Sequence, residues 1–207
     1  MRKSIRTGLI AGAIAAAGIG LTAAPAAAAD ASWTVTGASG YAYGYSDDTQ
    51  LRVPRSGAVL KCVDAEADAT INNGSYSSTV GTIDSTTWTT CTGPFGLTFN
   101  VTHGGTWNIK GVQPTADPAV NVGSITNISA SISGPACSAT FTGGVPGYYR
   151  NATGTLSVDP TAPNPGNVSL VASGVTGCLG IIQNGDTAQF TGNFEIDPNT
   201  IDLTYVP

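Results

Sequence analysis

The clearest pattern in the chain is the alternation of apolar and polar side chains that follows Cys62. From Val63 to Ile71 every second residue is apolar, and from Asp64 to Thr70 the residues between them are acidic or carry a hydroxyl. Successive side chains of a strand point to opposite faces, so this period of two predicts a strand with one buried and one solvent-facing side.

Shorter alternating runs recur along the chain and are separated by Gly, Pro, Asn or Asp. Asn72-Asn73-Gly74 and Asn184-Gly185-Asp186 tolerate positive φ, and each predicts a tight hairpin. No segment after residue 30 sustains a 3.6-residue period, so the sequence predicts an all-β fold, either an antiparallel β-sandwich or a barrel of short strands. Further strands are predicted at residues 32–36, 41–45, 76–83, 86–90, 96–101, 105–110, 123–133, 138–142, 153–158, 167–172, 187–194 and 201–205.

The N-terminal segment has the three features of a secretory leader. Three basic residues among the first six precede an apolar run of Ala, Gly, Ile and Leu, and small residues follow up to Ala29. This order predicts a Sec-type signal peptide at residues 1–29 and a single all-β domain at residues 30–207, located outside the cell or in its envelope. The apolar run is shorter than the roughly 20 residues of a membrane span, and no second run follows. We therefore expect no span in the mature chain.

Four cysteines lie after the leader, at Cys62, Cys91, Cys137 and Cys178. An even number in an exported chain predicts two disulfides, whereas zinc is a poor alternative because the cysteines are far apart in sequence and the chain has one histidine. Four cysteines allow three pairings. Cys62–Cys91 with Cys137–Cys178 is the favoured one, because each bridge then staples one half of the chain.

Two Cys-x-Gly corners, at Cys91-Thr92-Gly93 and Cys178-Leu179-Gly180, suggest two pseudo-repeated halves. Gly-Thr-Ile at residues 81–83 and Gly-Thr-Leu at residues 154–156 lie at similar distances after the first cysteine of each half, and the longer second half has a Pro-rich loop at residues 159–166. One detail opposes a strict repeat. Cys62 shares its parity with acidic residues, so a β-bulge beside it is needed to match the halves.

Charge restricts the partners of the mature chain. Three of the eight Lys and Arg residues lie in the leader, which leaves five against thirteen acidic residues and a net charge of about −8. Nucleic acid and anionic membranes are bound by clustered Lys and Arg. We therefore expect neither as a partner, and the oligomeric state stays open.

Candidate chemistry is sparse. His103 is the one histidine and could serve as the base of a serine hydrolase, but the chain has no Gly-x-Ser-x-Gly elbow. Asp64, Glu66 and Asp68 form the one acidic cluster and are a weak candidate for calcium, because an EF-hand loop needs Gly at the position that Ala69 occupies. The simpler interpretation is that the three acids form the solvent-exposed face of a strand. We expect no enzyme activity, no metal and no cofactor.

Tyrosines provide a second candidate site. Tyr41, Tyr43 and Tyr45 share one face of a predicted strand, and Tyr148 and Tyr149 follow Pro-Gly in a predicted loop. Exposed tyrosines on a rigid scaffold are typical of surfaces that bind a glycan or a cell-surface protein. Tyrosines at alternate positions also occur as core-facing anchors, and the sequence leaves both alternatives open.

Three segments carry a resemblance to known proteins. Residues 91–99 (CTGPFGLTF), 133–140 (SGPACSAT) and 177–186 (GCLGIIQNGD), together with the Ala-rich leader, resemble small exported all-β proteins of high-GC actinobacteria. The resemblance covers most of the mature chain and implies compartment and architecture, with no activity attached.

Together these observations predict a secreted or cell-envelope β-protein without catalysis, either ligand-binding or structural. Two alternatives are a small extracellular hydrolase built around His103 and a pore-forming envelope barrel. The second requires strands of about 9–11 residues with an apolar outer face, whereas most predicted strands are shorter and broken by Gly.

Overall fold

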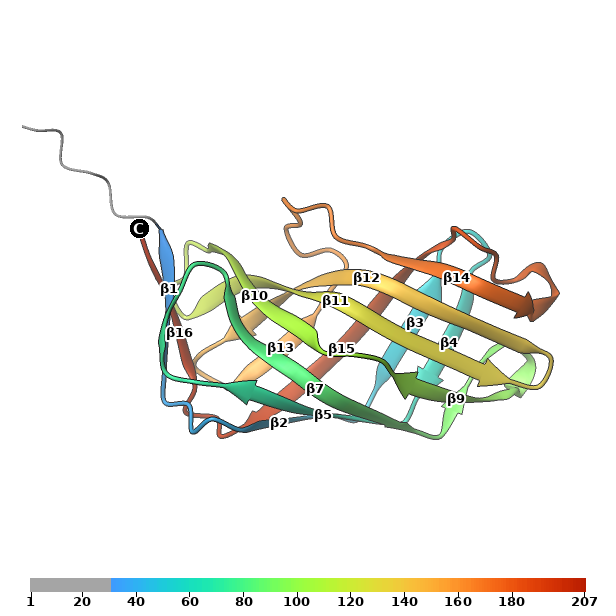
Figure 1. The fold of residues 1–207 in the computed structure, drawn as a ribbon, viewed down its shortest axis with the longest axis horizontal. Coiled ribbons are helices and arrows are strands. Elements are labelled where there is room, and N and C mark those ends of the chain that lie inside the picture. Colours follow the sequence, from blue (N-terminus) through green and yellow to red (C-terminus); the bar gives the residue numbers. More distant parts are fainter. Residues whose placement is uncertain (1–30) are drawn as a thin grey trace, which may run out of the picture.

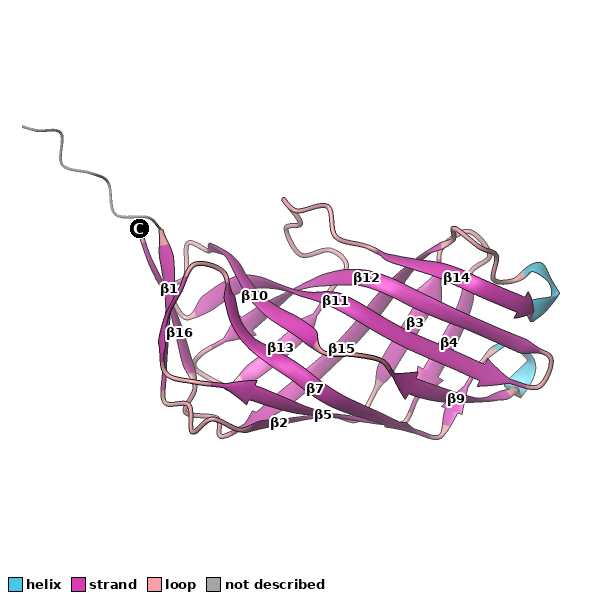
Figure 2. Ribbon diagram, viewed as in Figure 1, coloured by secondary structure: helices cyan, strands magenta, loops and turns pink. Residues whose placement is uncertain are grey.

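The computed structural model describes residues 31–207, so the predicted leader lies outside the described residues. The described chain consists of antiparallel strands with two single-turn 3-10 helices (Figures 1 and 2), which confirms the all-β prediction. The strands and helical turns are β1 (Ser32–Thr36), β2 (Ala42–Ser46), β3 (Thr49–Val53), β4 (Ala58–Cys62), β5 (Asp64–Ile71), β6 (Gly74–Tyr76), β7 (Thr79–Thr89), β8 (Cys91–Thr92), η1 (Pro94–Gly96), β9 (Thr98–His103), β10 (Trp107–Pro114), β11 (Val120–Gly134), β12 (Cys137–Arg150), β13 (Thr155–Val158), β14 (Leu170–Gly177), η2 (Cys178–Gly180), β15 (Thr187–Asp197) and β16 (Asp202–Val206).

Several of these strands continue one another, so that the main sheet has eight long rows. Along β15, for example, β2 pairs with its C-terminal half and β3 with its N-terminal half, so β2 and β3 form one row. The rows are β2/β3, β4/β5, β7/β8, β9/β10, β11, β12, β13/β14 and β15, and each row pairs with the next in sequence. Because β15 pairs back with β2 and β3, the sheet closes on itself as an up-and-down barrel.

The two halves of the chain each contribute four consecutive rows to this barrel. Cys62–Cys91 joins the second and third rows of the first half, and Cys137–Cys178 joins the second and third rows of the other half. The favoured disulfide pairing is thus confirmed, and each bridge lies within one half of the chain. The extra length of the second half lies between β13 and β14, where the first half passes directly from β7 to β8.

A bend at Val63, between β4 and β5, resolves the parity conflict between the halves. Cys62 and Ala65 are both buried, whereas Val63 between them is 54% exposed. Two residues therefore lie between these two inward-facing positions, whereas a regular strand has only one. The prediction that Val63 faces inward with Ala65 is wrong, because the bend turns it outward.

Two local predictions fail because distant strands decide the pairing. Residues 72–74 do not form a tight hairpin, since β6 leaves the barrel and pairs with β1. Tyr148 and Tyr149 lie within β12 instead of a loop. The glycines that mark this segment as a turn allow close approach of neighbouring backbone. A Cβ on Gly147 would lie 2.3 Å from the carbonyl oxygen of Ser157.

A separate three-stranded sheet of β16, β1 and β6 closes one end of the barrel (Figure 1). Trp33 of β1 is 2% exposed and packs edge to face with Tyr205 of β16 at 5.2 Å between ring centroids. We call this the cap end. Since rows alternate in direction, the corners that follow β3, β8, β11 and β14 lie at the opposite end, beside both disulfides, and we call it the disulfide end.

Candidate ligand-binding cavity

An apolar cavity of about 110 Å³ lies inside the cap-end half of the barrel. One wall is built from the small inward residues of two neighbouring strands, Ala42 and Gly44 of β2 and Ala67 and Ala69 of β5. These alanines belong to the alternating run that is the strongest pattern in the sequence. Their short side chains leave space that leucine or valine would fill, which explains why the barrel core is hollow here.

Larger side chains form the remaining walls and the roof. Trp88, Trp107 and Phe194 line the cavity from β7, β10 and β15. Val35 and Leu203 from the cap sheet also line it. The cap therefore belongs to the site, and any ligand must pass the cap, or pass between separated rows of the barrel, to enter or leave.

A second apolar cavity of about 70 Å³ lies deeper, in the disulfide-end half. Its lining includes Cys62, Leu60 and Phe141. The two cavities share five lining residues, so only side chains separate them. The shared residues are Trp88, Trp107, Ile128, Val145 and Phe190.

Thr49 supplies a polar group at the second cavity. Its residue is 1% exposed, and its hydroxyl oxygen has no hydrogen-bond partner among the described residues. A buried hydroxyl without a partner is costly, because it has lost its hydrogen bonds to water. It can donate one hydrogen bond to a molecule in the cavity. No pattern in the sequence indicated this site, since Thr49 lies outside the strands that the alternation predicts.

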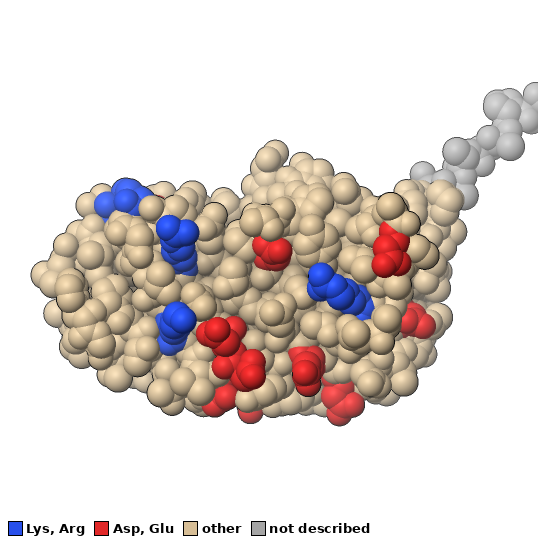
Figure 3. All heavy atoms as spheres, turned by 180° about the vertical axis from the view of Figure 1, so that it is seen from behind, with Lys and Arg blue, Asp and Glu red and all other residues tan. Residues whose placement is uncertain are grey.

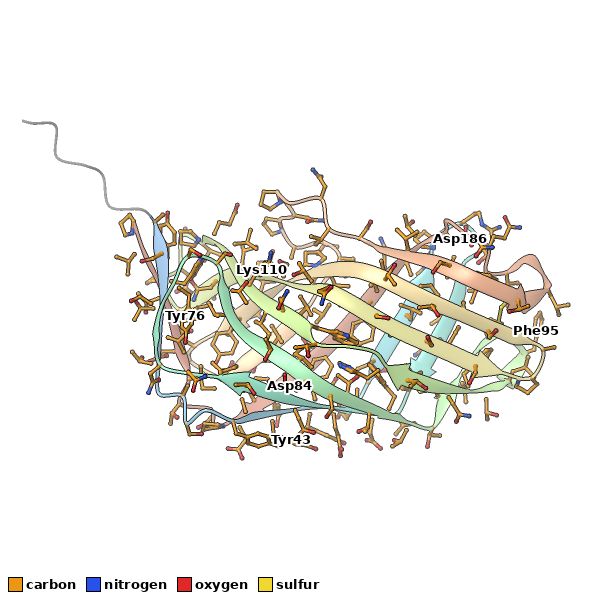
Figure 4. All side chains as sticks on the ribbon, viewed as in Figure 1. Tyr43, Tyr76, Asp84, Phe95, Lys110 and Asp186 are labelled. Carbon is orange, nitrogen blue, oxygen red and sulfur yellow. A yellow bond between two sulfur atoms is a disulfide. The ribbon has the colours of Figure 1, made fainter. Side chains whose placement is uncertain are left out.

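The predicted tyrosine row lies on the outer wall, not in the core (Figure 4 labels Tyr43). Tyr41, which is 55% exposed, donates to Asp68 at 2.5 Å, and Tyr45 donates to Asp64 at 2.8 Å. The hydrogen bond from Tyr41 holds the pKa of Asp68 below its usual value, and each tyrosine pKa is raised in return by its carboxylate.

The third strand of this outer surface completes the pairing of the acidic residues. Hydroxyls of β7 also donate to them, from Ser85 to Asp68 at 2.7 Å and from Thr89 to Asp64 at 2.9 Å. Glu66 accepts in the same way from Thr87. The three acids therefore stand in a row, each tied to its neighbouring strands. Within residues 31–207 no three His, Cys, Asp or Glu side chains converge as a metal site would require.

Tyr148 and Tyr149 do not join the tyrosine row, because two rows of the barrel lie between β12 and β2. Tyr149 lines the first cavity and donates to the carbonyl of Ile201 at 2.7 Å. Burial, with a smaller contribution from Asp202, raises the pKa of Tyr149 to about 12. The five predicted tyrosines thus divide between an outer wall and the cavity.

His103 has both ring nitrogens engaged, one by a threonine hydroxyl and the other by a backbone carbonyl rather than by a carboxylate. Nε2 lies 2.6 Å from the carbonyl oxygen of Gly105, which can only accept, so Nε2 carries the proton. Nδ1 then accepts from the hydroxyl of Thr86 at 2.9 Å. The ring stacks on Trp107 at 4.4 Å between centroids. These contacts position the histidine against the barrel wall without forming a Ser-His-Asp arrangement.

Comparisons with protein-family models, curated proteins and solved structures found no match for this chain. The described residues 31–207 contain no helix with the length and apolar character needed to span a membrane. The functional argument therefore rests on the geometry of the cavity and of the surface.

Proposed function

We propose that this protein is an exported, non-catalytic binding protein that encloses a small, mainly hydrocarbon ligand inside its barrel. The cavity of about 110 Å³ carries the proposal. Protein cores normally leave few voids of this size. At about 24 cal/mol per Å³, it costs on the order of 2–3 kcal/mol, a large share of the about 5–15 kcal/mol by which domains are stable.

A purely structural protein gains nothing from that cost, whereas a ligand that fills the cavity offsets it. Apolar cavities only somewhat larger, about 150 Å³, bind benzene or xenon. Export is supported by the two disulfides, which persist in oxidising compartments. The hydroxyl of Thr49 favours a ligand with one oxygen. Because only side chains separate the two cavities, an extended ligand that reaches from one into the other is favoured.

The proposal is tested by ligand-induced stabilisation of the purified, oxidised protein with xenon, n-hexane and 1-hexanol as probes. A ligand at one hundred times its Kd stabilises by about 2.7 kcal/mol, which for a domain of this size raises Tm by roughly 5–10 °C. Ala69→Leu fills the first cavity from its alanine wall and should abolish this shift while leaving or raising the basal Tm. Ala116→Leu, on an exposed turn, is the matched control.

Thr49→Val separates the shape of the site from its polarity. The variant should bind n-hexane as well as the natural sequence does and lose any preference for 1-hexanol. If no probe shifts Tm or perturbs the NMR signals of lining methyl groups, or if Ala69→Leu binds as its control does, the proposed function is wrong.

A further inference from the structure

Each Cys-x-Gly corner presents one large apolar side chain to solvent at the disulfide end (Figure 4 labels Phe95). Phe95 of η1 is 82% exposed and Leu179 of η2 is 83% exposed, the two highest values among the exposed large hydrophobic residues. They occupy equivalent corners of the two halves, after β8 and after β14. A highly exposed apolar side chain is thus present at the same corner of both halves.

Both residues also have an unusual backbone conformation. φ is 62° at Phe95 and 48° at Leu179, in the left-handed region where bulky residues are rare. The corners are held in this form by local bonds. The amide of Gly93 donates to the carbonyl of Leu97 at 2.8 Å, and that of Ile181 donates to the carbonyl of Cys178 at 2.9 Å. Strain kept at an exposed apolar residue suggests a function for that residue.

A cation lies at the base of each corner. Lys61 is opposite Thr92 in the β4–β8 pair, at the start of the corner that carries Phe95. Arg55 donates to the carbonyl of Gly180 at 2.9 Å, directly after Leu179, and forms an ion pair with Asp186.

Three of the five Lys and Arg residues that follow the leader lie in the disulfide-end half of the barrel. Arg52, on β3, adds a third cation to this half of the barrel. Figure 3 shows the back face, where most of the visible Lys and Arg lie toward one end, Asp and Glu lie toward the middle and the other end, and one further basic patch lies among the acidic residues. The expectation that anionic membranes are not partners rests on the net charge of the whole chain, which does not show this local grouping of cations.

We propose that the disulfide end docks on an anionic lipid surface, with Phe95 and Leu179 inserted among the headgroups and acyl chains. Two side chains of this kind bury only about 300–400 Å², less than half of the about 800 Å² that each partner of a standard protein interface buries. A lipid surface accepts protruding side chains one at a time, and Lys61 and Arg52 add attraction to anionic headgroups, whereas the charge of Arg55 is compensated by Asp186. This docking is independent of the proposed cavity ligand.

The test is vesicle flotation of the full mature protein with phosphatidylcholine vesicles, with and without phosphatidylglycerol. Binding should require phosphatidylglycerol, and Phe95→Asn and Leu179→Asn should each weaken it about 10-fold. Asparagine tolerates positive φ, so these variants should keep the fold. Val206→Asn, which removes an exposed apolar side chain at the cap end, is the matched control and should bind normally. Lys61→Gln should weaken binding about 5-fold.

A reporter variant makes the insertion visible directly. Phe95→Trp should show a blue-shifted emission on binding and quenching by lipids brominated on the acyl chain. The proposal is overturned if the natural sequence does not float with anionic vesicles, or if the two corner variants bind as Val206→Asn does. It is equally overturned if the corner residues instead mediate a dimer, seen as a concentration-dependent species in sedimentation that either variant abolishes.

Discussion

Replacing Gly111 by alanine should show how tightly the cap is seated on the barrel. A Cβ at this position of β10 would lie 2.4 Å from two ring atoms of Trp33, far inside van der Waals contact. Gly111 does not have a positive φ, so the backbone itself accepts alanine. The indole must therefore move, and overpacking of this kind costs about 1–3 kcal/mol of unfolding free energy.

In a Trp33→Ala background, Gly111→Ala should instead raise the free energy of unfolding. Trp33→Ala alone costs about 3–5 kcal/mol, because the side chain is 2% exposed. In that background the Cβ has space, and replacing a strand glycine gains up to about 0.5–1 kcal/mol. The double-mutant cycle should then give a coupling energy of about 2–3 kcal/mol between the two positions.

Urea unfolding of the four proteins, followed by fluorescence and far-UV circular dichroism, measures these free energies. Gly166→Ala, at a glycine whose added Cβ would make only an ordinary contact, is the control and should change stability by less than about 0.5 kcal/mol. If Gly111→Ala costs the same with and without Trp33, the cap is not seated as described. Trp33→Leu replaces Trp33→Ala if the latter does not fold.

Three further predictions concern the bridges, the buried hydroxyl and the cavity tyrosine. Replacing Cys137 and Cys178 by alanine should lower unfolding free energy by about 3–4 kcal/mol in urea titrations, from the 41-residue separation of the cysteines; an unchanged midpoint would contradict this. Thr49→Val should raise unfolding free energy by about 0.5–2 kcal/mol because it removes a buried hydroxyl without a protein partner, and destabilisation would show that the hydroxyl is satisfied. Tyr149, whose pKa burial raises to about 12, stabilises the fold fully below pH 10, its contribution falling as pH rises from about 10 to 12. Ultraviolet titration should show one phenol that loses its proton at a higher pH than the others, and Tyr149→Phe should remove this step. A loss of the Tyr149 phenol proton near pH 10 would refute the assignment.

Much of the fold could be predicted from local patterns. The alternating run after Cys62 predicted β5 and its outer acids, and the spacing of the cysteines favoured the correct bridges. Patterns of this kind report which face a residue occupies, because the side-chain period of a strand is two. They fail where a distant element sets the conformation. Residues 72–78 bend away because β1 offers β6 a partner, and Tyr148 stays in a strand because glycines let neighbouring backbone approach.

The candidate site was harder to predict than the fold. The alanines at positions 65, 67 and 69 were visible as an inward face, but small inward residues show a cavity only when the opposite wall is known. Thr49 lies outside the predicted strands because the connection between β2 and β3 interrupts the alternation. Phe95 and Leu179 lie in the corner motifs that the sequence singled out, yet their exposure depends on which end of the barrel those corners reach.

The sequence by itself thus determined the all-β strand composition, the favoured disulfide pairing and the outward side of β5. Only the tertiary structure decided which face of β2 is outward, that β15 returns to β2 and β3 to close the barrel, and that a cap covers one end. The physical reason is that period and turn chemistry act within a few residues, whereas closure depends on hydrogen bonds between strands more than a hundred residues apart.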